Sequence, residues 1–511
     1  IFIASENGAL PGGKVGGIAD VMRDLPPAVA RQGFLVSVVT PSYGTLHHLD
    51  GARQNGCVSA TFRGSRESFD VYELRSPGVR YILLDHPMFM PTEPGLIYHD
   101  DGSDRPFATD ANKFAGFGAA AAAWVRSLSP RPVAVHLNDW HAAFYLLQRD
   151  FAGDAEALRG IRTVFSIHNL AYQGQRPLDG DDSSLSRWFP ELDIDRAIIA
   201  DPHAGDCINP MAYAIRSADA INTVSPTYAE EICRPSDPEA GFFGGEGLEA
   251  DLEAIAQHEC LYGILNGCEY SDSRPARPGW QRIIGLLRDQ AIAWSEREPG
   301  REAHRIACER IATLPRRRPL HVLTSIGRLV SQKASLMLEP VYQSPTALDA
   351  ILENLGEHGV VILIGSGESA LERRMIEVAR RQPNLVFMNG YSETLAAPLY
   401  RGGDLFLMPS SFEPCGISQM LAMRDGQPCV VNAVGGLCDT VNDGETGFVF
   451  HGSTPRDQAE AFVATVSRAL ELRAERPVRW ASIAKRAERE RFDWDTAARH
   501  YIEQLYESDR V

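Results

Sequence analysis

A carboxylate, Glu413, lies in a bend between a predicted strand and a predicted helix. The apolar run 404–408 predicts a buried strand, and residues 417–424 have a helical pattern. The first N–H groups of a helix attract anionic ligands because they have no partner inside the helix. A second turn rich in glycine, 435–437, follows the predicted strand 428–432. The plain alternative is that Glu413 caps a helix and the glycines only make turns, but a carboxylate here is not needed for solubility.

Two cations, Arg328 and Lys333, follow another predicted strand, residues 320–325. An arginine side chain grips phosphate oxygens with a planar fork, whereas a lysine supplies a compact positive charge. Five residues apart on a loop that enters a helix, both side chains can converge on one diphosphate. Both could instead be solvated surface residues, but their place after a strand end, like that of Glu413, favours a phosphate site.

Polar residues also follow strand ends in the N-terminal half. Asp139 and His168 each come directly after a predicted strand, where ligands bind in open α/β sheets. Lys14 lies in a loop rich in glycine, residues 11–17, and glycines let a backbone approach a ligand closely. The sequence therefore predicts ligand-binding groups in both halves of the chain.

The elements that must position these groups alternate between strands and helices, which predicts a parallel, doubly wound sheet in each half. The predicted strands are 1–5, 35–40, 133–136, 162–167, 220–224, 320–325, 360–364, 385–388, 404–408 and 428–432, and the main predicted helices are 18–31, 110–128, 282–295, 370–380, 395–400 and 493–507. Residues 58–84 predict an excursion that contains a hairpin, and residues 175–206 predict a surface excursion.

Composition narrows the class of protein. A chain of 511 residues is too long for one ordinary core and predicts two domains. No apolar run approaches the roughly 20 residues that a membrane span needs. The nine cysteines include no C-x-x-C pair, which predicts free thiols in a reducing cytoplasm. A net charge of −17 argues against nucleic acid as a partner, whereas a neutral polymer such as a glucan carries no charge to be repelled.

Seven segments resemble motifs of the bacterial and plant glycogen/starch synthase family, and the resemblance covers nearly the whole chain. The segments are 14–21 (KVGGIADV), 136–141 (HLNDWH), 168–174 (HNLAYQG), 225–232 (SPTYAEEI), 263–267 (GILNG), 328–333 (RLVSQK) and 412–441, which begins FEPCG. The resemblance implies a GT-B fold, with two Rossmann-like α/β domains facing across a deep interdomain cleft. It also implies transfer of glucose from ADP-glucose to the non-reducing end of an α-1,4-glucan with retention of configuration, without a metal or other cofactor.

The expected domains are an acceptor-side domain, residues 1–268, and a nucleotide-sugar-binding domain, residues 319–491. Residues 269–318 are expected to be the linker and the entry into the second domain, and a C-terminal helix within 492–511 to complete the first. Because neither half holds all the candidate groups, we expect the domains to close for reaction, with a hinge near residues 266–272.

The resemblance also implies roles for individual residues. Glu413 would bind the donor glucose, Arg328 and Lys333 would stabilise the leaving diphosphate, His168 would lie by the sugar and Asp139 near the acceptor. Tyr391 would stack on the base. The other expected binding residues are Lys14, Gly16, Gly17, Asn169, Tyr172, Gln173, Asn266, Cys415, Gly416, Ser418 and Gly436.

Several positions depart from the family pattern, so the resemblance leaves acceptor handling and donor preference open. They are Val15 for the usual Thr, Ser411 for Arg, Ala334 for Gly, Asn112-Lys113-Phe114 for N-x-x-R-F, and residues 209–216, which lack a Lys-containing pattern. Two alternatives stay open: a related enzyme with UDP-glucose or a small acceptor, and a catalytically weak glucan-binding homologue. The retention of Lys14, His168, Arg328, Lys333 and Glu413 together argues against the second.

Overall fold

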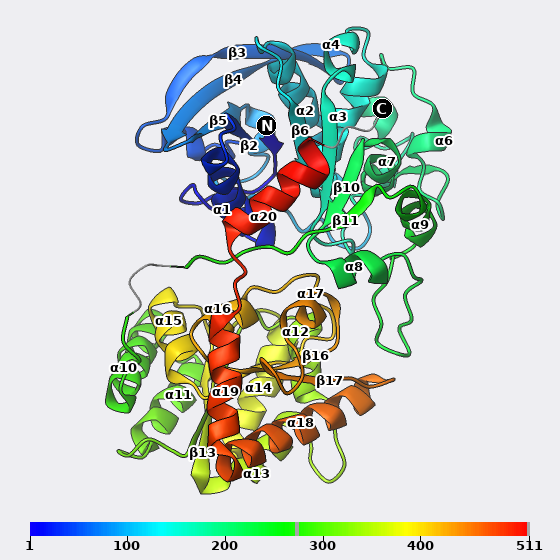
Figure 1. The fold of residues 1–511 in the computed structure, drawn as a ribbon. Coiled ribbons are helices and arrows are strands. Elements are labelled where there is room, and N and C mark those ends of the chain that lie inside the picture. Colours follow the sequence, from blue (N-terminus) through cyan, green and yellow to red (C-terminus); the bar gives the residue numbers. More distant parts are fainter. Residues whose placement is uncertain (271–274, 508–511) are drawn as a thin grey trace. The chain divides into compact units, whose positions relative to one another are not determined.

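The computed structural model describes residues 1–270 and 275–507, which fold into two compact units (Figure 1). Unit 1 comprises Ile1–Ser236, Gly244–Gly267 and the described chain from Asp493 on. Unit 2 comprises Asp237–Phe243 and the described part of Cys268–Phe492. The predicted hinge near 266–272 and the C-terminal segment 492–511 lie partly outside the described residues, whereas the predicted helix 493–507 lies within them.

Unit 1 is built on a nine-stranded sheet of order β11-β10-β7-β6-β1-β2-β5-β4-β3. Its strands are β1 (Phe2–Ile3), β2 (Val36–Pro41), β3 (Arg53–Phe62), β4 (Ser65–Ser76), β5 (Val79–Asp85), β6 (Ala134–Asn138), β7 (Arg162–Ile167), β10 (Ala220–Thr223) and β11 (Leu261–Gly263). The pairs from β11 to β5 are parallel, and β3 and β4 form the antiparallel hairpin expected within residues 58–84.

The helices of unit 1 include a C-terminal segment that returns to this sheet. They are α1 (Gly17–Arg31), α2 (Ala108–Arg126), α3 (Asp139–Phe151), α4 (Glu156–Arg159), α5 (Leu185–Trp188), α6 (Arg196–Ile199), α7 (Pro210–Ser217), α8 (Pro226–Glu231), α9 (Glu249–Gln257) and α20 (Trp494–Tyr501), which continues into a π-helical turn, Ile502–Tyr506. Helix α20 lies beside α1 (Figure 1). Tyr506 Oη is 2.7 Å from His136 Nδ1, so a buried polar contact anchors the segment to β6.

The prediction that residues 175–206 form only a surface excursion is wrong. Trp188 and Phe189 are buried, and Trp188 Nε1 donates to Asn112 Oδ1 at 2.6 Å. The segment contains short strand β8 (Arg176–Pro177), which pairs with β9 (Cys207–Ile208). Its abundance of aspartate and proline suggested a solvated loop, but the segment buries its aromatic residues against α2.

Unit 2 is a six-stranded, fully parallel sheet of order β14-β13-β12-β15-β16-β17. Its strands are β12 (His321–Ile326), β13 (Gly359–Ile364), β14 (Leu385–Met388), β15 (Leu405–Met408), β16 (Cys429–Asn432) and β17 (Phe448–Phe450). Strand β13 is buried along its whole length, as a strand covered on both faces should be. Alternate residues therefore supply two cores: Val361 and Leu363 face one, and Val360 and Ile362 face the other.

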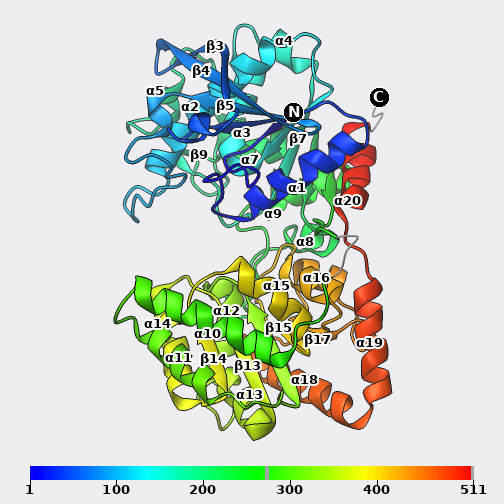
Figure 2. The same ribbon diagram turned by 90° about the vertical axis from the view of Figure 1, so that its left-hand side faces the viewer.

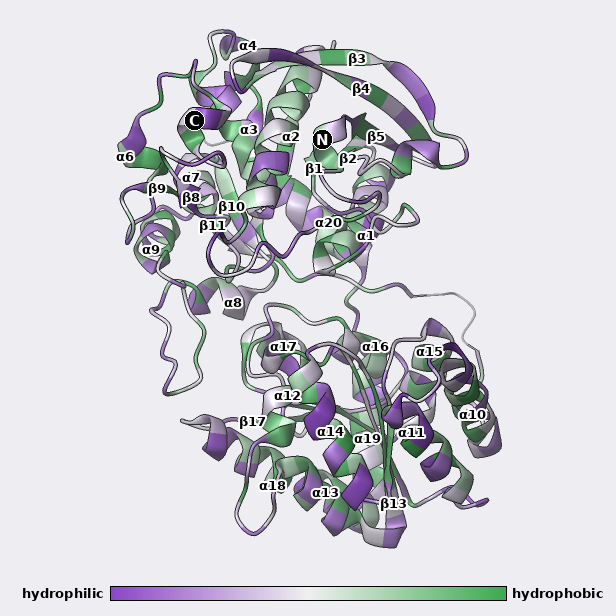
Figure 3. Ribbon diagram, turned by 180° about the vertical axis from the view of Figure 1, so that it is seen from behind, coloured by the Kyte–Doolittle hydropathy of each residue, from purple (hydrophilic) through white to green (hydrophobic). Residues whose placement is uncertain are grey.

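Helices cover both faces of this sheet, and their outer surfaces are hydrophilic (Figure 3). They are α10 (Trp280–Arg297), α11 (Glu302–Thr313), α12 (Ser331–Leu338), α13 (Ala347–Leu355), α14 (Ser369–Arg381), α15 (Glu393–Gly402), α16 (Ser418–Arg424), α17 (Gly435–Thr440), α18 (Pro455–Glu475) and α19 (Pro477–Arg489). None of the helices in the described parts of either unit is both long enough and apolar enough to span a membrane.

Within the predicted linker and entry segment, residues 269–318, the predicted helix 282–295 is confirmed as part of α10, but a second helix, α11, was not predicted. Residues 280–313 form α10 and α11, which lie side by side (Figure 2). Ile283, Leu287 and Ile311 are buried in one core of unit 2. The many arginine and glutamate residues of this segment occupy the solvent side of two amphipathic helices, which is why the segment resembled a linker.

Candidate active site

The candidate residues of unit 2 lie at the point where its strand order reverses. Strands β12 and β15 are neighbours in the sheet, while β13 follows β12 on its other side. Arg328 follows β12, Lys333 lies in the first turn of the next helix, α12, and Glu413 comes after β15. The carboxyl ends of two such strands form a crevice in which ligands bind. The topology thus brings together groups that are far apart in the chain.

Glu413 and Lys333 form an ion pair at this crevice. Lys333 Nζ lies 3.0 Å from Glu413 Oε2, and Ser410 Oγ donates to the same oxygen at 3.0 Å. The Glu413 side chain is only 7% exposed, so these two donors fix the direction of its carboxylate. Ser411, the departure from the family's arginine, donates its N–H to Gln332 O at 2.8 Å. It therefore ties the loop after β15 to the first turn of α12.

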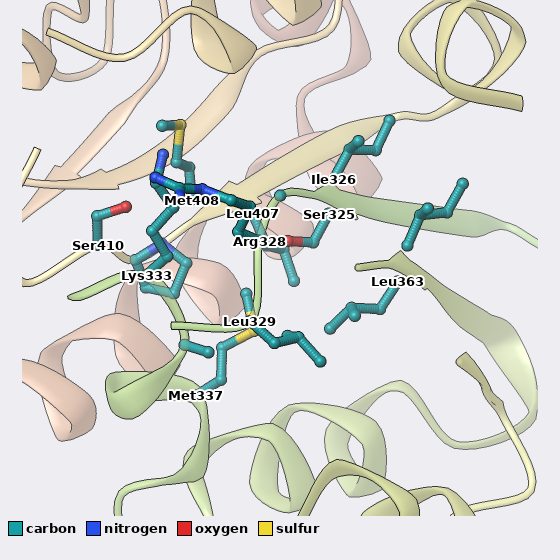
Figure 4. Close-up of a pocket in the computed structure, with 14 residues that line it drawn as sticks. Ser325, Ile326, Arg328, Leu329, Lys333, Met337, Leu363, Leu407, Met408 and Ser410 are labelled. Atoms are coloured by element: carbon teal, nitrogen blue, oxygen red, sulfur yellow. The ribbon is translucent and has the colours of Figure 1, made fainter. Parts of the chain in front are cut away.

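A pocket opens beside this pair (Figure 4). Arg328, Lys333 and Ser410 are among its lining residues, and Ala334 places a methyl group in its wall. Arg328 is exposed and forms no ion pair with any residue that the structure describes. The pocket therefore presents one uncompensated cation and one cation shared with a carboxylate, which suits an anionic group.

The glycines after β16 hold the Glu413 loop by close approach. A Cβ atom on Gly435 would lie 2.2 Å from Glu413 O, and one on Gly436 would lie 2.3 Å from Cys415 O. Gly436 N–H donates to Glu413 O at 3.1 Å, so this amide serves the loop rather than a ligand. Glycine is needed here because any side chain would push the Glu413 loop out of place.

The other predicted residues of unit 2 surround the same edge. Tyr391 follows β14 and is 69% exposed, as a residue that stacks on a ligand must be. Cys415 is buried, and Gly416 adopts a left-handed φ of 78° in the bend before α16. Ser418 begins α16, and its side chain hydrogen-bonds Tyr400. Helix α16 has only seven residues, so the arginine and lysine are the main source of positive charge.

In unit 1 the strand order reverses between β1 and β6, and candidate residues again follow both strands. Glu6, which no sequence motif singles out, is 2% exposed and organises the glycine-rich loop after β1. Its Oε2 accepts from Val15 N–H at 2.8 Å and from Gly16 N–H at 2.5 Å, and its Oε1 accepts from Tyr98 Oη at 2.8 Å. The Gly16 amide is thus engaged inside the protein, whereas Gly17 begins α1.

Lys14 lies on the outside of the same loop. Its Nζ is 2.7 Å from Asp20 Oδ1 on α1, and its side chain is about half-exposed. The lysine must leave Asp20 to reach a ligand, which a flexible, solvated ion pair allows because such pairs stabilise a protein by about 1 kcal/mol or less.

Asp139 and Asn138 both hold His168. Asp139 adopts an unusual left-handed φ of 54°, and its Oδ1 accepts from His168 N–H at 2.7 Å. Burial raises the pKa of the Asp139 carboxyl to about 7, although N–H groups of His168 and Asn169 oppose the shift. The Asn138 Oδ1 lies 2.9 Å from His168 Nε2. Loss of water around the imidazole lowers the pKa of His168 to about 4, so the ring is neutral near pH 7.

Other predicted residues of unit 1 divide into two groups. Tyr172 is 57% exposed, and Asn169 is partly exposed, so both can reach a ligand. Gln173 is buried and satisfied by the protein, since its amide donates to Leu170 O and Glu246 O and accepts from Asn209. It shapes the loop. Asn266 is buried, and its Oδ1 has no hydrogen-bond partner among the described residues.

Two sequence profiles match the chain. One, described as the starch synthase catalytic domain, matches residues 1–254, and the other, glycosyl transferases group 1, matches residues 321–471. Each match falls within one structural unit apart from a short loop, Asp237–Phe243. The two profiles therefore correspond to the two half-sites described above.

Full-length relatives agree with these matches. The glycogen synthase of Anaeromyxobacter sp. (strain Fw109-5) is 36% identical over 525 residues, which cover 99% of this chain and 98% of that protein. The glycogen synthase of Trichodesmium erythraeum is 33% identical over 520 residues, with the same coverage. The catalytic domain of starch synthase IV from Arabidopsis thaliana, solved bound to ADP and acarbose, superposes with a TM-score of 0.76 at 24% identity and covers 99% of this chain and 98% of that one.

The sheets, the strand-end residues and the relatives lead to one assignment. Both units are Rossmann-like, as expected for a GT-B enzyme. Identity above 30% extends over almost the whole length of curated relatives. The chain belongs to the glycogen/starch synthase family and is a glycosyltransferase.

Proposed function

We propose that this enzyme transfers glucose from ADP-glucose to the non-reducing end of an α-1,4-glucan, with retention of configuration and without a metal. The observation that carries the proposal is the grouping of Arg328, Lys333 and Glu413 at the carboxyl edge of one sheet. The adenine nucleotide is suggested by the ADP in the Arabidopsis structure, and the glucan by the glycogen synthase relatives.

The leaving diphosphate sets the first chemical requirement. When the bond between glucose C1 and the phosphate oxygen breaks, the electron pair stays on the diphosphate, and negative charge builds on the β-phosphate. Arg328 and Lys333 are cations that line one pocket, so both can stabilise that charge. These two side chains supply the positive charge that a divalent ion would provide in other transferases.

The developing glucosyl cation sets the second requirement. A carboxylate nearby favours an oxocarbenium-like sugar, and Glu413 is held in one orientation by Lys333 and Ser410. The ion pair between Glu413 and Lys333 couples the two steps. When Lys333 moves toward the phosphate, less positive charge remains beside the Glu413 carboxylate, which can then stabilise the glucosyl cation more strongly.

The acceptor calls for different groups. The hydroxyls of a glucan need neutral hydrogen-bonding partners and an aromatic surface, and unit 1 offers Asn169 and Tyr172 for them and His168 for the transferred sugar. Asp139 acts through His168, since its carboxylate holds the backbone of that residue. Lys14 would add positive charge at the phosphate after leaving Asp20.

A panel of donors and acceptors tests the proposal. ADP-glucose, UDP-glucose and GDP-glucose would each be incubated with glycogen, with maltooligosaccharides or with glucose, and release of nucleoside diphosphate would be measured with and without EDTA. We expect fastest release from ADP-glucose with the glucans, unaffected by EDTA. Faster turnover of UDP-glucose, or of glucose as acceptor, would favour the related-enzyme alternative. No release above that of Glu413→Gln with any pair would mean a binding homologue.

A further inference from the structure

The amide of Asn138 is oriented by its own hydrogen bonds. This residue ends β6 and is 1% exposed. Its side-chain nitrogen lies 3.2 Å from Ile3 O and 3.3 Å from His136 O. Both partners are backbone carbonyl groups, which can only accept hydrogen bonds. The nitrogen of the amide must therefore point at them, and the amide oxygen must be the atom that faces His168.

This orientation decides where His168 carries its proton. The Asn138 Oδ1 lies 2.9 Å from His168 Nε2, and an amide oxygen can only accept. In a neutral imidazole one nitrogen is a donor and the other an acceptor, so Nε2 carries the hydrogen and Nδ1 carries the lone pair. The Nδ1 atom bonds to none of the described residues, and the ring as a whole is only partly buried.

We propose that Asn138 is a positioning residue that fixes His168 as the Nε2–H tautomer, so that Nδ1 accepts a hydrogen bond from a sugar hydroxyl. The inference deepens the proposed function and rests on it for the identity of the ligand. It makes His168 a neutral acceptor in the reaction rather than a proton donor. Asn138 and Asp139, which are adjacent in the chain, then have complementary roles, because Asn138 fixes the ring and Asp139 fixes the backbone.

The neighbourhood of His168 leaves this assignment undisturbed. The titratable groups around it are Asp139, which bonds its N–H, and the imidazoles of His136 and His141. Burial lowers the pKa values of both imidazoles well below the usual value, so neither adds a positive charge near pH 7. No charged side chain among the described residues hydrogen-bonds the ring itself.

Asn138→Asp tests the inference because it keeps the shape of the side chain and places a negative charge against His168 Nε2, at the cost of the two hydrogen bonds to Ile3 O and His136 O. A carboxylate facing Nε2 stabilises the imidazolium form and raises the pKa of His168, after which Nδ1 carries a hydrogen and can no longer accept. The matched control is Asn222→Asp, which also places a carboxylate in the buried part of unit 1 but faces Ser166, Tyr501 and His136 instead of His168.

The first measurement is two-bond ¹H–¹⁵N NMR of the full-length protein labelled in histidine, with the His168 signal assigned by its loss in His168→Gln. We expect the Nε2–H pattern in the wild type between pH 6 and 8, unchanged in Asn222→Asp, and an imidazolium pattern that titrates in this range in Asn138→Asp. An Nδ1–H pattern or a mixture of tautomers in the wild type would overturn the inference, whatever the panel of donors shows.

The second measurement is the pH profile of glucosyl transfer. At pH 7 we expect kcat/KM of Asn138→Asp to fall about 10- to 100-fold, the size typical of one lost hydrogen bond to a polar substrate group. Activity should recover toward the wild-type value at higher pH, where the variant imidazole loses its proton, while the affinity for ADP stays constant. A loss that is equal at every pH, as a purely structural defect would give, or no loss at all would contradict the inference, even if transfer itself is confirmed.

Discussion

The two half-sites have the same sheet topology but differ in the charge of their ligand-binding groups. In both units the candidate residues follow neighbouring strands at the point where strand order reverses. In unit 2 this edge carries the cations Arg328 and Lys333 with a single carboxylate between loops. In unit 1 the two carboxylates, Glu6 and Asp139, are buried and bond backbone N–H groups.

The difference shows what topology leaves open. Strand order determines where a ligand can bind in such a sheet, but charge and hydrogen-bond capacity determine which part of the ligand it can be. An edge with uncompensated cations suits a diphosphate, and an edge with neutral, hydrogen-bonding groups suits sugar hydroxyls.

The largest effect is expected for Glu413→Gln. The variant keeps the hydrogen bonds from Ser410 and Lys333 but loses the charge that favours the glucosyl cation. We expect kcat to fall by about 10²- to 10³-fold, as for removal of one group that stabilises a transition state. Stability should fall by only about 1 kcal/mol, because the hydrogen bonds remain. Glu460→Gln, in an exposed pair with Arg456, is the matched control. Activity within a few-fold of the wild type would show that Glu413 is misassigned.

Arg328→Ala and Lys333→Ala should each cost about 2–4 kcal/mol in the transition state, measured from kcat/KM for ADP-glucose. Arg328 has no compensating partner among the described residues, whereas Lys333 shares its charge with Glu413, so removing Lys333 also changes the carboxylate. Transfer should remain independent of divalent ions. Loss of activity in EDTA that Mg²⁺ restores would refute the metal-free proposal.

Titration of the Asp139 carboxyl should make the unfolding free energy of the protein depend on pH. The pKa of its carboxyl is raised to about 7 in the folded protein from 3.8, so the native state binds a proton that the unfolded state releases between these values. Stability from this group is complete below pH 4 and is lost as pH rises to 7, at about 1 kcal/mol per pH unit.

Asp139→Asn removes this titration and serves as the comparison. The unfolding free energy of the wild type minus that of the variant should fall from pH 4 to 7 and then stay constant. A difference that rises with pH, or that does not change, would show that the carboxylate is already ionised well below neutral pH.

The smallest effect is expected for Ala334→Gly, which restores the residue usual in the family. Glycine within α12 should destabilise the helix by about 1 kcal/mol relative to alanine. Because the methyl group only lines the pocket wall, ADP affinity should change less than threefold. A large gain in affinity by calorimetry would instead identify Ala334 as a determinant of donor binding.

Much of the fold could be predicted from the sequence, because buried parallel strands are continuous apolar runs. The predicted bounds of β7 and β14 agree with the structure residue by residue. Segment 175–206 and helix α11 in segment 269–318 were missed because neither contains a continuous apolar run. Each mixes a few buried apolar residues, such as Trp188 and Ile311, with many charged ones, and the charged residues dominate the local pattern.

The site was predictable only in part. Asp139 and Glu413 could be predicted as site residues because each is a polar residue that follows a strand end. Glu6 and Asn138 also stand at strand ends, but what they do depends on the amide of Gly16 and the ring of His168, which only the folded chain brings to them. Side-chain type and spacing could not reveal that a carboxylate serves the backbone instead of a ligand.

Calorimetric titration of two ligands into variants of each unit tests whether unit 2 binds the nucleotide and unit 1 the glucan. ADP and a maltooligosaccharide would each be titrated into the wild type, Lys333→Ala in unit 2 and Tyr172→Ala in unit 1. We predict that Lys333→Ala lowers the affinity for ADP by at least about tenfold and leaves the affinity for the oligosaccharide unchanged. Tyr172→Ala should lower the affinity for the oligosaccharide and leave that for ADP unchanged. Equal weakening of both ligands in both variants, or weakening of ADP by Tyr172→Ala alone, would contradict the account.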